Sequence, residues 1–276
     1  MRIIGLRNSV GAEYIAQDLG EQVRILGTKA EFWKGPERLI HGAASDGSAR
    51  LPADAFTEVP VVPAYARVLC VGLNYRAHAA EGGFSVPQWP TIFGRFTESL
   101  SVGGVAAPVP ADEPGLDWEG EVAAYLGSSV IDADPDAARR AILGYSTFLD
   151  LTARVAQKRT SQWMLGKNGD RSGPMGPLVT ADEVGDLRDG LHLQTRVNGV
   201  TVQEATTADM IFEVGELVSL ISRTLTLRCG DVIVTGTPEG VGYVRNPPWF
   251  LHDGDVVEVE VDRLGTLRTP IGGSRT

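Results

Sequence analysis

Apolar residues in the last third of the chain alternate with polar ones in short runs, the pattern of β-strands with one buried face. Strands are therefore predicted over residues 191–198, 231–235, 256–261 and 266–270. Asn198-Gly199, at the end of the first run, is a strong signal for a hairpin turn. Because few stretches have helical spacing, the pattern predicts a mixed α/β fold that is mainly β, and not a doubly wound parallel sheet.

The rest of the chain has fewer but similar signals. Strands are predicted over residues 3–6, 23–26, 38–41, 67–72 and 145–151, and helices over 11–19, 75–81, 135–143 and 208–225. Gly82-Gly83 ends the second of these helices, and Asp134-Pro135 provides the cap and first residue of the third. Gly144 separates that third helix from the strand that follows it.

A proline-containing segment, residues 59–63, separates the chain into two parts. Neither Pro60 nor Pro63 has an N–H group to donate to a strand ladder, so the segment reads as a linker. We therefore expect a small N-terminal α+β domain over residues 1–62 and a larger, β-rich domain over residues 63–276.

The main chemical signal lies in residues 118–127. As a strand, this segment places Glu119 and Glu121 on one face, yet both faces are otherwise apolar. Two buried carboxylates need a compensating cation, and a divalent metal ion is the simplest one. Glu258 and Glu260 also have this spacing, but they alternate with valines and are expected to face solvent.

A metal site needs a third ligand, and two acids are candidates. Asp150 lies in a predicted apolar strand, where it either pairs with Arg154 or binds the metal. Asp117 lies two residues before Glu119 on the same face and is the alternative. Three carboxylates without a histidine form an all-oxygen site, which suits Mg²⁺, Mn²⁺ or Ca²⁺.

His78 and Glu81 lie three residues apart on a predicted helix and therefore share a face. A carboxylate that orients an imidazole makes a candidate general base, although the same spacing is typical of a surface ion pair. The flanking glycines permit the hinge that a lid needs.

Two further segments have the composition of a substrate site. Lys167 lies before a Gly- and Pro-rich loop, where it could stabilise a developing enolate or be an ordinary loop lysine. Residues 235–242 follow a predicted strand, and their glycines would let main-chain N–H groups approach an anion. There is no Gly-x-Gly-x-x-Gly or Walker motif and no Gly-x-Ser-x-Gly elbow, so nucleotide binding and serine hydrolase chemistry are unsupported.

The composition of the chain excludes several classes of binding partner. The formal net charge is -10 without a basic run, which argues against nucleic acid and anionic membranes. The two cysteines, Cys70 and Cys229, form no disulfide framework, and no segment is apolar enough to span a bilayer. We expect a cytoplasmic protein that acts on a small molecule.

Together, these segments resemble the fumarylacetoacetate hydrolase family over about residues 66–271. The resemblance rests on eight blocks in the family's order: VGLNYRAHAAE at 71–81, DWEGE at 117–121, DLTAR at 150–154, QWMLGK at 162–167, GPMGP at 173–177, NG at 198–199, GDVIVTGTP at 230–238 and LHDGD at 251–255. Each block is weak alone, whereas their order is highly specific.

The resemblance implies a β-rich fumarylacetoacetate hydrolase-type fold, usually as a homodimer, and assigns the site residue by residue. It implies metal ligation by Glu119, Glu121 and Asp150, and a water-activating dyad of His78 and Glu81 on a lid. The remaining implied residues are Lys167 in catalysis and Arg95, Gln162, Gly236 and Thr237 at the substrate. Two departures concern the substrate: Val155 where relatives commonly have Asp, and residues 169–171 where an aromatic is common.

The implied activity is hydrolysis of a carbon–carbon bond in a 2,4-dioxo acid, of the acylpyruvate or fumarylpyruvate type, through an enolate stabilised by Mg²⁺ or Mn²⁺. Such enzymes serve the catabolism of aromatic compounds. A decarboxylase, tautomerase or isomerase acting on a related 2-oxo or 2-hydroxydienoic acid is the alternative, since each passes through the same enolate. A scaffold without activity is disfavoured by the complete set of acids and the His78–Glu81 pair.

Overall fold

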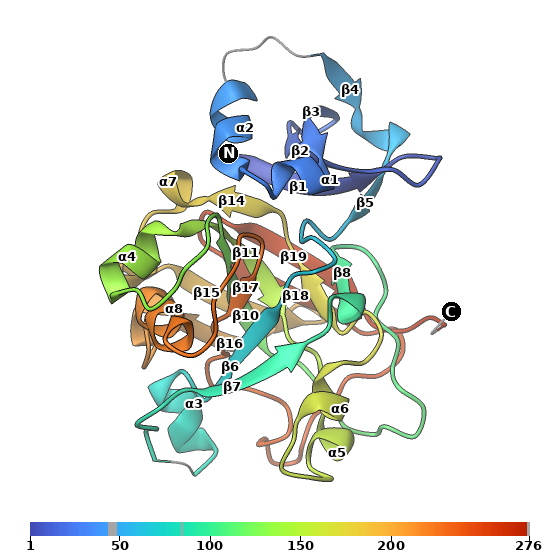
Figure 1. The fold of residues 1–276 in the computed structure, drawn as a ribbon. Helices are drawn as coiled ribbons and strands as arrows, with labels where there is room; N and C mark the ends of the chain where they lie inside the picture. Colours follow the sequence, from blue (N-terminus) through green and yellow to red (C-terminus); the bar gives the residue numbers. More distant parts are fainter. Residues whose placement is uncertain (44–48, 84, 275–276) are drawn as a thin grey trace.

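The computed structural model describes residues 1–43, 49–83 and 85–274 and contains mainly β-structure (Figure 1). The largest sheet runs in the order β4-β3-β2-β1-β14-β11-β10-β17-β6-β7, and β5, β8 and β13 pair beside this path. Its strands are β1 (Arg2–Arg7), β2 (Glu13–Asp18), β3 (Gln22–Thr28), β4 (Arg50–Pro52), β5 (Thr57–Val59), β6 (Val68–Gly72), β7 (Thr91–Arg95), β8 (Leu100–Val102), β10 (Gly120–Leu126), β11 (Ile142–Leu149), β13 (Gly173–Met175), β14 (Leu178–Thr180) and β17 (Val232–Val234).

A second sheet, in the order β16-β15-β18-β19, packs against the first through one apolar core. Its strands are β15 (His192–Val197), β16 (Val200–Thr206), β18 (Val256–Val261) and β19 (Gly265–Pro270), and a separate pair consists of β9 (Leu116–Asp117) and β12 (Thr152–Ala153). The two sheets approach closely at Gly120, where an added Cβ would lie 2.1 Å from Oγ1 of Thr195. The glycine between the two glutamates therefore allows the sheets to approach.

The helices are short. They are α1 (Lys29–Phe32), α2 (Pro36–Ala43), α3 (Arg76–Glu81), α4 (Pro135–Arg140), α5 (Arg154–Gln157), α6 (Met164–Lys167), α7 (Ala181–Val184) and α8 (Val214–Ser222), with 3-10 turns at Ala53–Ala55, Thr97–Ser99, Leu187–Asp189 and Thr207–Asp209. Helices α3, α5 and α6 lie at the end of the molecule opposite the N-terminal strands (Figure 1). None of the helices in the described ranges is long and apolar enough to cross a membrane.

The mainly β fold is confirmed, and so are most of the predicted strands. The hairpin at Asn198-Gly199 joins β15 to β16, with positive φ angles of 51° and 79° at its two central residues. The helix predicted over 75–81 is α3, and Gly83, with φ of 73°, follows its end. The side chain of Asp134 caps α4 by accepting a hydrogen bond from Ala137 N–H at 2.8 Å, as predicted.

Two predictions in the N-terminal region are wrong. The segment predicted as a helix over 11–19 contains strand β2 (Glu13–Asp18) instead, because these residues pair with β1 on one side and β3 on the other. Residues 38–41 belong to helix α2 rather than to a strand, and Pro36 begins that helix. In both cases contacts with neighbouring elements override the local preference.

Two helices are shorter than predicted. The helix expected over 208–225 is α8, which begins at Val214 because the carboxylate of Glu213 accepts hydrogen bonds from its first N–H groups. Helix α4 ends at Arg140, and strand β11 runs through Gly144 instead of starting after it. An added Cβ at Gly144 would lie 2.2 Å from the carbonyl oxygen of Val179, so glycine permits this close pairing.

The N-terminal strands continue the large sheet. Strand β1 pairs with β14 through Arg2–Val179 and Ile3–Leu178, so the N-terminal strands join the sheet that carries the site. Val61 and Val62, in the predicted linker, are buried at 3% and 4% exposure. The division of the chain at residue 62 stays a prediction.

Candidate metal centre

Three carboxylates converge at one end of the central strands. Glu119 directly precedes β10, Glu121 lies within it, and Asp150 directly follows β11. The antiparallel register pairs Gly120 with Leu149, and Asp150 N–H donates to the carbonyl oxygen of Glu119 at 2.9 Å. One oxygen from each acid lies within 4.8 Å of the others. This all-carboxylate arrangement fits a hard divalent cation such as Mg²⁺, Mn²⁺ or Ca²⁺.

The burial of the three carboxylates also favours a bound divalent cation. Glu119, Glu121 and Asp150 are 6%, 2% and 0% exposed. Burial, together with the charges of Asp150 and Glu119, raises the pKa of Glu121 well above its usual range. Its only hydrogen bond among the described residues comes from Gly236 N–H at 2.6 Å, so Glu121 lacks the positive partner that a bound cation would provide.

Lys167 partly neutralises the other two acids. Its Nζ lies 2.5 Å from Oε2 of Glu119 and 2.8 Å from Oδ2 of Asp150, and the residue is 2% exposed. Burial alone would raise the pKa of Glu119, but the charges of Lys167 and Arg154 outweigh it and lower that pKa to about 2. Glu119 is therefore ionised as a metal ligand must be.

Asp117, the alternative third ligand, lies outside the cluster. Its carboxylate accepts hydrogen bonds from Nε of Arg154 at 2.8 Å and from the N–H groups of Gly242 and Tyr243 at 2.7 and 3.1 Å. Arg154 also approaches Glu119, with Nη2 2.8 Å from Oε1. The pairing of Arg154 with Asp117 leaves Asp150 as the third acid of the cluster.

Arg95, predicted to contact the substrate, lies beside the carboxylate cluster. Its guanidinium is fully buried and binds Asp150, with Nε 3.0 Å from Oδ1 and Nη2 in closer contact with the same oxygen. The same group donates to Oγ of Ser172 at 2.8 Å and to the carbonyl oxygen of Leu151 at 3.0 Å. These contacts use the guanidinium and orient a carboxylate of the cluster, so the role of Arg95 at the substrate stays a prediction.

The cluster opens into a cavity of about 340 Å³, which we call the inner cavity. Its volume is in the usual range for a small-molecule site. The residues that line it come from β6, α3, β7, β10, α5, α6 and the loops after β6, β9, α5 and β17: Val71, Gly72, Leu73, His78, Thr91, Phe93, Glu119, Glu121, Arg154, Gln157, Lys158, Thr160, Trp163, Lys167, Thr237 and Tyr243.

The pair predicted as a base reaches this cavity. His78 lines it, with 8% exposure, and its Nδ1 lies 3.5 Å from Oε2 of Glu81. Gly240 N–H donates to both carboxylate oxygens of Glu81, at 3.1 and 3.2 Å. Helix α3 is thereby attached to the loop after β17, which places the imidazole on the same side as the carboxylates.

The predicted substrate contacts are only partly brought together. Thr237 lines the inner cavity, whereas Gly236 directs its N–H group to Glu121. Gln162 is exposed and does not line the cavity. Gln157 lines it instead, on α5, where its Oε1 accepts a hydrogen bond from Arg154 at 3.1 Å. The three-residue spacing of Arg154 and Gln157 on a helical turn was the only sequence signal for this position.

The second acidic pair faces away from the core, as predicted. Val257 and Val259 are fully buried, while Glu258 and Glu260 form ion pairs with Arg196 at 3.5 and 2.8 Å. Their side chains retain 29% and 49% exposure. These acids lie on the second sheet and belong to neither the cluster nor the inner cavity.

Comparisons with known proteins show which family the chain resembles. Residues 67–272 match the family model described as fumarylacetoacetate (FAA) hydrolase C-terminal. The chain is 38% identical to the mitochondrial oxaloacetate tautomerase fahd2 of Xenopus laevis over 208 residues, which cover 74% of this chain and 65% of the frog protein. The match thus spans just under two thirds of that relative.

Two solved structures are similar in fold and sequence. One is 5-carboxymethyl-2-hydroxymuconate delta-isomerase from Mycobacterium smegmatis, with a TM-score of 0.77, 31% identity and coverage of 99% of this chain and 100% of that one. The other is fumarylpyruvate hydrolase from Pseudomonas aeruginosa in complex with Mn²⁺ and pyruvate, with a TM-score of 0.70, 32% identity and coverage of 79% and 92%.

These similar proteins are enzymes of three kinds: a tautomerase, an isomerase and a hydrolase. The family model covers most of the chain, and the relatives exceed 30% identity over most of its length. The converging carboxylates and the family match lead to one conclusion: this chain belongs to the fumarylacetoacetate hydrolase family.

Proposed function

We propose that the protein is a divalent-metal-dependent hydrolase that cleaves a carbon–carbon bond of a 2,4-dioxo acid of the acylpyruvate type. The observation that carries the proposal is that the candidate metal ligands and the candidate catalytic residues line the same cavity. Two carboxylates of the cluster, Lys167 and His78 all line this one space. A 2-oxo carboxylate presents two oxygens to a cation, and the adjacent imidazole is available for proton transfer.

Glu119, Glu121 and Asp150 are the residues that would hold the cation, for which we propose Mg²⁺ or Mn²⁺. When bound, such an ion supplies positive charge that stabilises the negative charge developing on the oxygens of the 2-oxo acid. The similarity to a hydrolase solved with Mn²⁺ and pyruvate supports this assignment.

His78 is proposed to take a proton from the attacking water. Its Nδ1 faces Glu81, which orients the ring and stabilises its protonated form, so Nε2 is the nitrogen left to accept the proton. The water oxygen bonds to the C4 carbonyl carbon, the C3–C4 bond breaks, and its electron pair stays on the C3 side as the enolate. Proton return to C3 yields the 2-oxo acid, and the C4 fragment leaves as a carboxylic acid.

Lys167 is proposed to stabilise the enolate. Lys167 lines the inner cavity and its ammonium group is held by Glu119 and Asp150, so the charge is positioned before substrate arrives. The Thr237 hydroxyl also lines the cavity, but it donates to the carbonyl oxygen of Gly120 at 3.0 Å and accepts from Gln203 at 2.8 Å. We therefore assign Thr237 to shaping the site and Lys167 to charge stabilisation.

The second candidate is keto–enol tautomerisation of a 2-oxo dicarboxylate such as oxaloacetate. It is supported by the 38% identity to a frog protein of that activity. The same residues serve it, because His78 would move a proton between carbon and oxygen while Lys167 stabilises the same enolate. Isomerisation of a hydroxydienoic acid is a related candidate, supported by the delta-isomerase structure.

Product identity tests the proposal. Metal-free protein would be reconstituted with Mg²⁺ or Mn²⁺ and supplied with acylpyruvates, with the enol form of oxaloacetate and with 2-hydroxyhepta-2,4-diene-1,7-dioate. Release of pyruvate with one carboxylic acid supports the hydrolase. Rapid conversion of enol to keto oxaloacetate, without cleavage of any acylpyruvate, would contradict the hydrolase proposal and favour the tautomerase.

We also propose that the protein is a homodimer, which a sedimentation measurement would test.

A further inference from the structure

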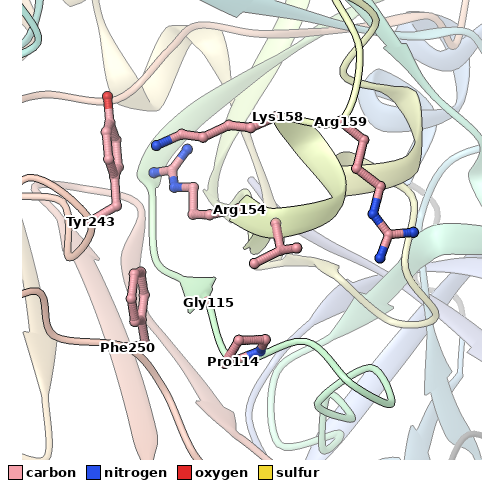
Figure 2. Close-up of a pocket in the computed structure, with 8 residues that line it drawn as sticks. Pro114, Gly115, Arg154, Lys158, Arg159, Tyr243 and Phe250 are labelled. Atoms are coloured by element: carbon pink, nitrogen blue, oxygen red, sulfur yellow. The ribbon is translucent and has the colours of Figure 1, made fainter.

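A second cavity adjoins the inner one and has an unusual charge. This outer cavity has a volume of about 450 Å³ and is lined by Pro114, Gly115, Arg154, Val155, Lys158, Arg159, Tyr243 and Phe250 (Figure 2). Its lining contains three cations and no acid, although the whole chain has a net charge of -10. Such a local reversal of charge favours an anionic ligand.

The two cavities share a wall made of Arg154, Lys158 and Tyr243. A ligand in the inner cavity therefore approaches the same side chains that line the outer one. Figure 2 shows Arg154 and Lys158 extending toward Tyr243, while Arg159 extends away from it. The shared wall connects the carboxylate cluster with the cationic space beyond it.

The two cations of this wall differ in how much of their charge is already neutralised. Arg154 pairs with both Asp117 and Glu119. Lys158 lies four residues later, and its Nζ is 4.2 Å from the centre of the Tyr243 ring. Within the described residues Lys158 forms no ion pair, and a ring face attracts a cation without neutralising it. Its charge is therefore available to a ligand.

The acids that share a cavity or a helix with Lys158 have other hydrogen-bond partners: Glu119 is held by Lys167 and Arg154, and Glu121 by Gly236 N–H. Glu113 lies at the start of α5, but it accepts hydrogen bonds from the N–H groups of Gly115, Val155 and Ala156. Val155, at 40% exposure, offers an apolar surface to the outer cavity. Arg154 and Lys158 are like charges at a four-residue spacing against one ring, and an anion beside Lys158 would relieve their repulsion.

We propose that Lys158 is a specificity-determining residue that binds a second carboxylate at the distal end of the substrate. The outer cavity accommodates the part of the chain around that group. This inference rests on the proposed function, because it assumes that the other end is a 2-oxo acid held at Glu119, Glu121 and Asp150. It selects dianionic 2-oxo acids over monoanionic ones of equal length.

Binding of unreactive analogues tests the inference apart from turnover. The Mg²⁺-loaded protein would be titrated in a calorimeter with 2-oxoglutarate, 2-oxoadipate and 2-oxopimelate. Each would be compared with the analogue that has a terminal methyl group in place of the distal carboxylate. We expect about tenfold or tighter binding of at least one dicarboxylate over its analogue, the range of a hydrogen bond to a charged group.

Variants then assign the preference to Lys158. Lys158→Met should remove the preference for the dicarboxylate without changing the affinity for the methyl analogues. Lys158→Arg should keep this preference. Val155→Asp should reduce it by placing a negative charge in the outer cavity, whereas Val155→Asn, of similar size, should not. Equal binding of both ligand types by the wild-type protein would overturn the inference alone.

Other outcomes have distinct meanings. Binding of no 2-oxo acid at all would contradict the proposed function and this inference together. Weaker binding of both ligand types to Lys158→Met would show that Lys158 acts on the 2-oxo acid end, which both ligand types have. That result would also overturn the inference. Two dicarboxylates bound per chain would identify the outer cavity as an independent anion site instead of a substrate subsite.

Discussion

The ammonium nitrogen of Lys167 lies 2.5 Å from Oε2 of Glu119, and both residues are almost completely buried. A second carboxylate, Asp150, shares the same ammonium group at 2.8 Å. Lysine thus serves as the internal cation of the cluster and would remain close to any metal ion that the acids bind. We expect its charge to contribute to folding as well as to the proposed chemistry, and these two contributions can be measured separately.

Lys167→Met should lower the free energy of unfolding of the metal-free protein by about 3 kcal/mol, because it removes the buried ammonium group that Glu119 and Asp150 share. Adding Mg²⁺ or Mn²⁺ should recover much of this loss by binding the same acids. Urea denaturation in EDTA and in excess metal measures both values. Lys34→Met, at an exposed lysine, is the control and should change stability by less than about 0.5 kcal/mol. Equal losses with and without metal would contradict a shared cluster.

Removal of the metal should abolish activity. EDTA is expected to inactivate the protein and Mg²⁺ or Mn²⁺ to restore it, since Glu119, Glu121 and Asp150 would hold the ion that stabilises the enolate. Glu121→Gln should greatly weaken metal binding, measured by calorimetry. The matched control is Glu258→Gln with Glu260→Gln, which removes only surface ion pairs and should cost less than about 1 kcal/mol of stability. Full activity in chelator would contradict the assignment.

His78→Ala should reduce turnover by about 10²–10⁴-fold, the usual effect of losing a general base. Metal affinity should be almost unchanged, because His78 belongs to the cavity wall and not to the carboxylate cluster. Steady-state rates and metal titrations of the same preparation separate the two effects. Glu81→Gln should give a smaller loss, since it removes the orienting group and not the base. Wild-type turnover by His78→Ala would make the pair structural.

Arg95→Met should weaken metal binding by about 10–100-fold, because the buried guanidinium orients Asp150. At saturating metal the Michaelis constant should change little, which distinguishes this role from the substrate contact expected from the sequence. Metal titration and substrate kinetics with the pure variant measure both quantities. A raised Michaelis constant with normal metal affinity would restore the substrate role.

Local sequence determined the parts of this protein that depend on neighbours along the chain. Alternating valines predicted β18 and the outward direction of Glu258 and Glu260, and Asp134 predicted the start of α4. The buried Glu119–Glu121 pair and the His78–Glu81 spacing could also be read from short segments. Each of these features depends on a side-chain periodicity or a capping bond that spans only a few residues.

Tertiary structure decided which distant residues meet. The pairing of Gly120 with Leu149 places Asp150 beside Glu119, while Arg154 binds Asp117. The pairing of two strands that are far apart in the sequence, such as those of Gly120 and Leu149, cannot be predicted from residue spacing. The same reason explains why the contact of Arg95 with Asp150, 55 residues away, was not predicted, and why β2 was wrongly predicted to be a helix when its pairing partners were unknown. Sequence supplied the chemical groups, and long-range packing chose their partners, because burial and charge compensation are properties of the folded chain.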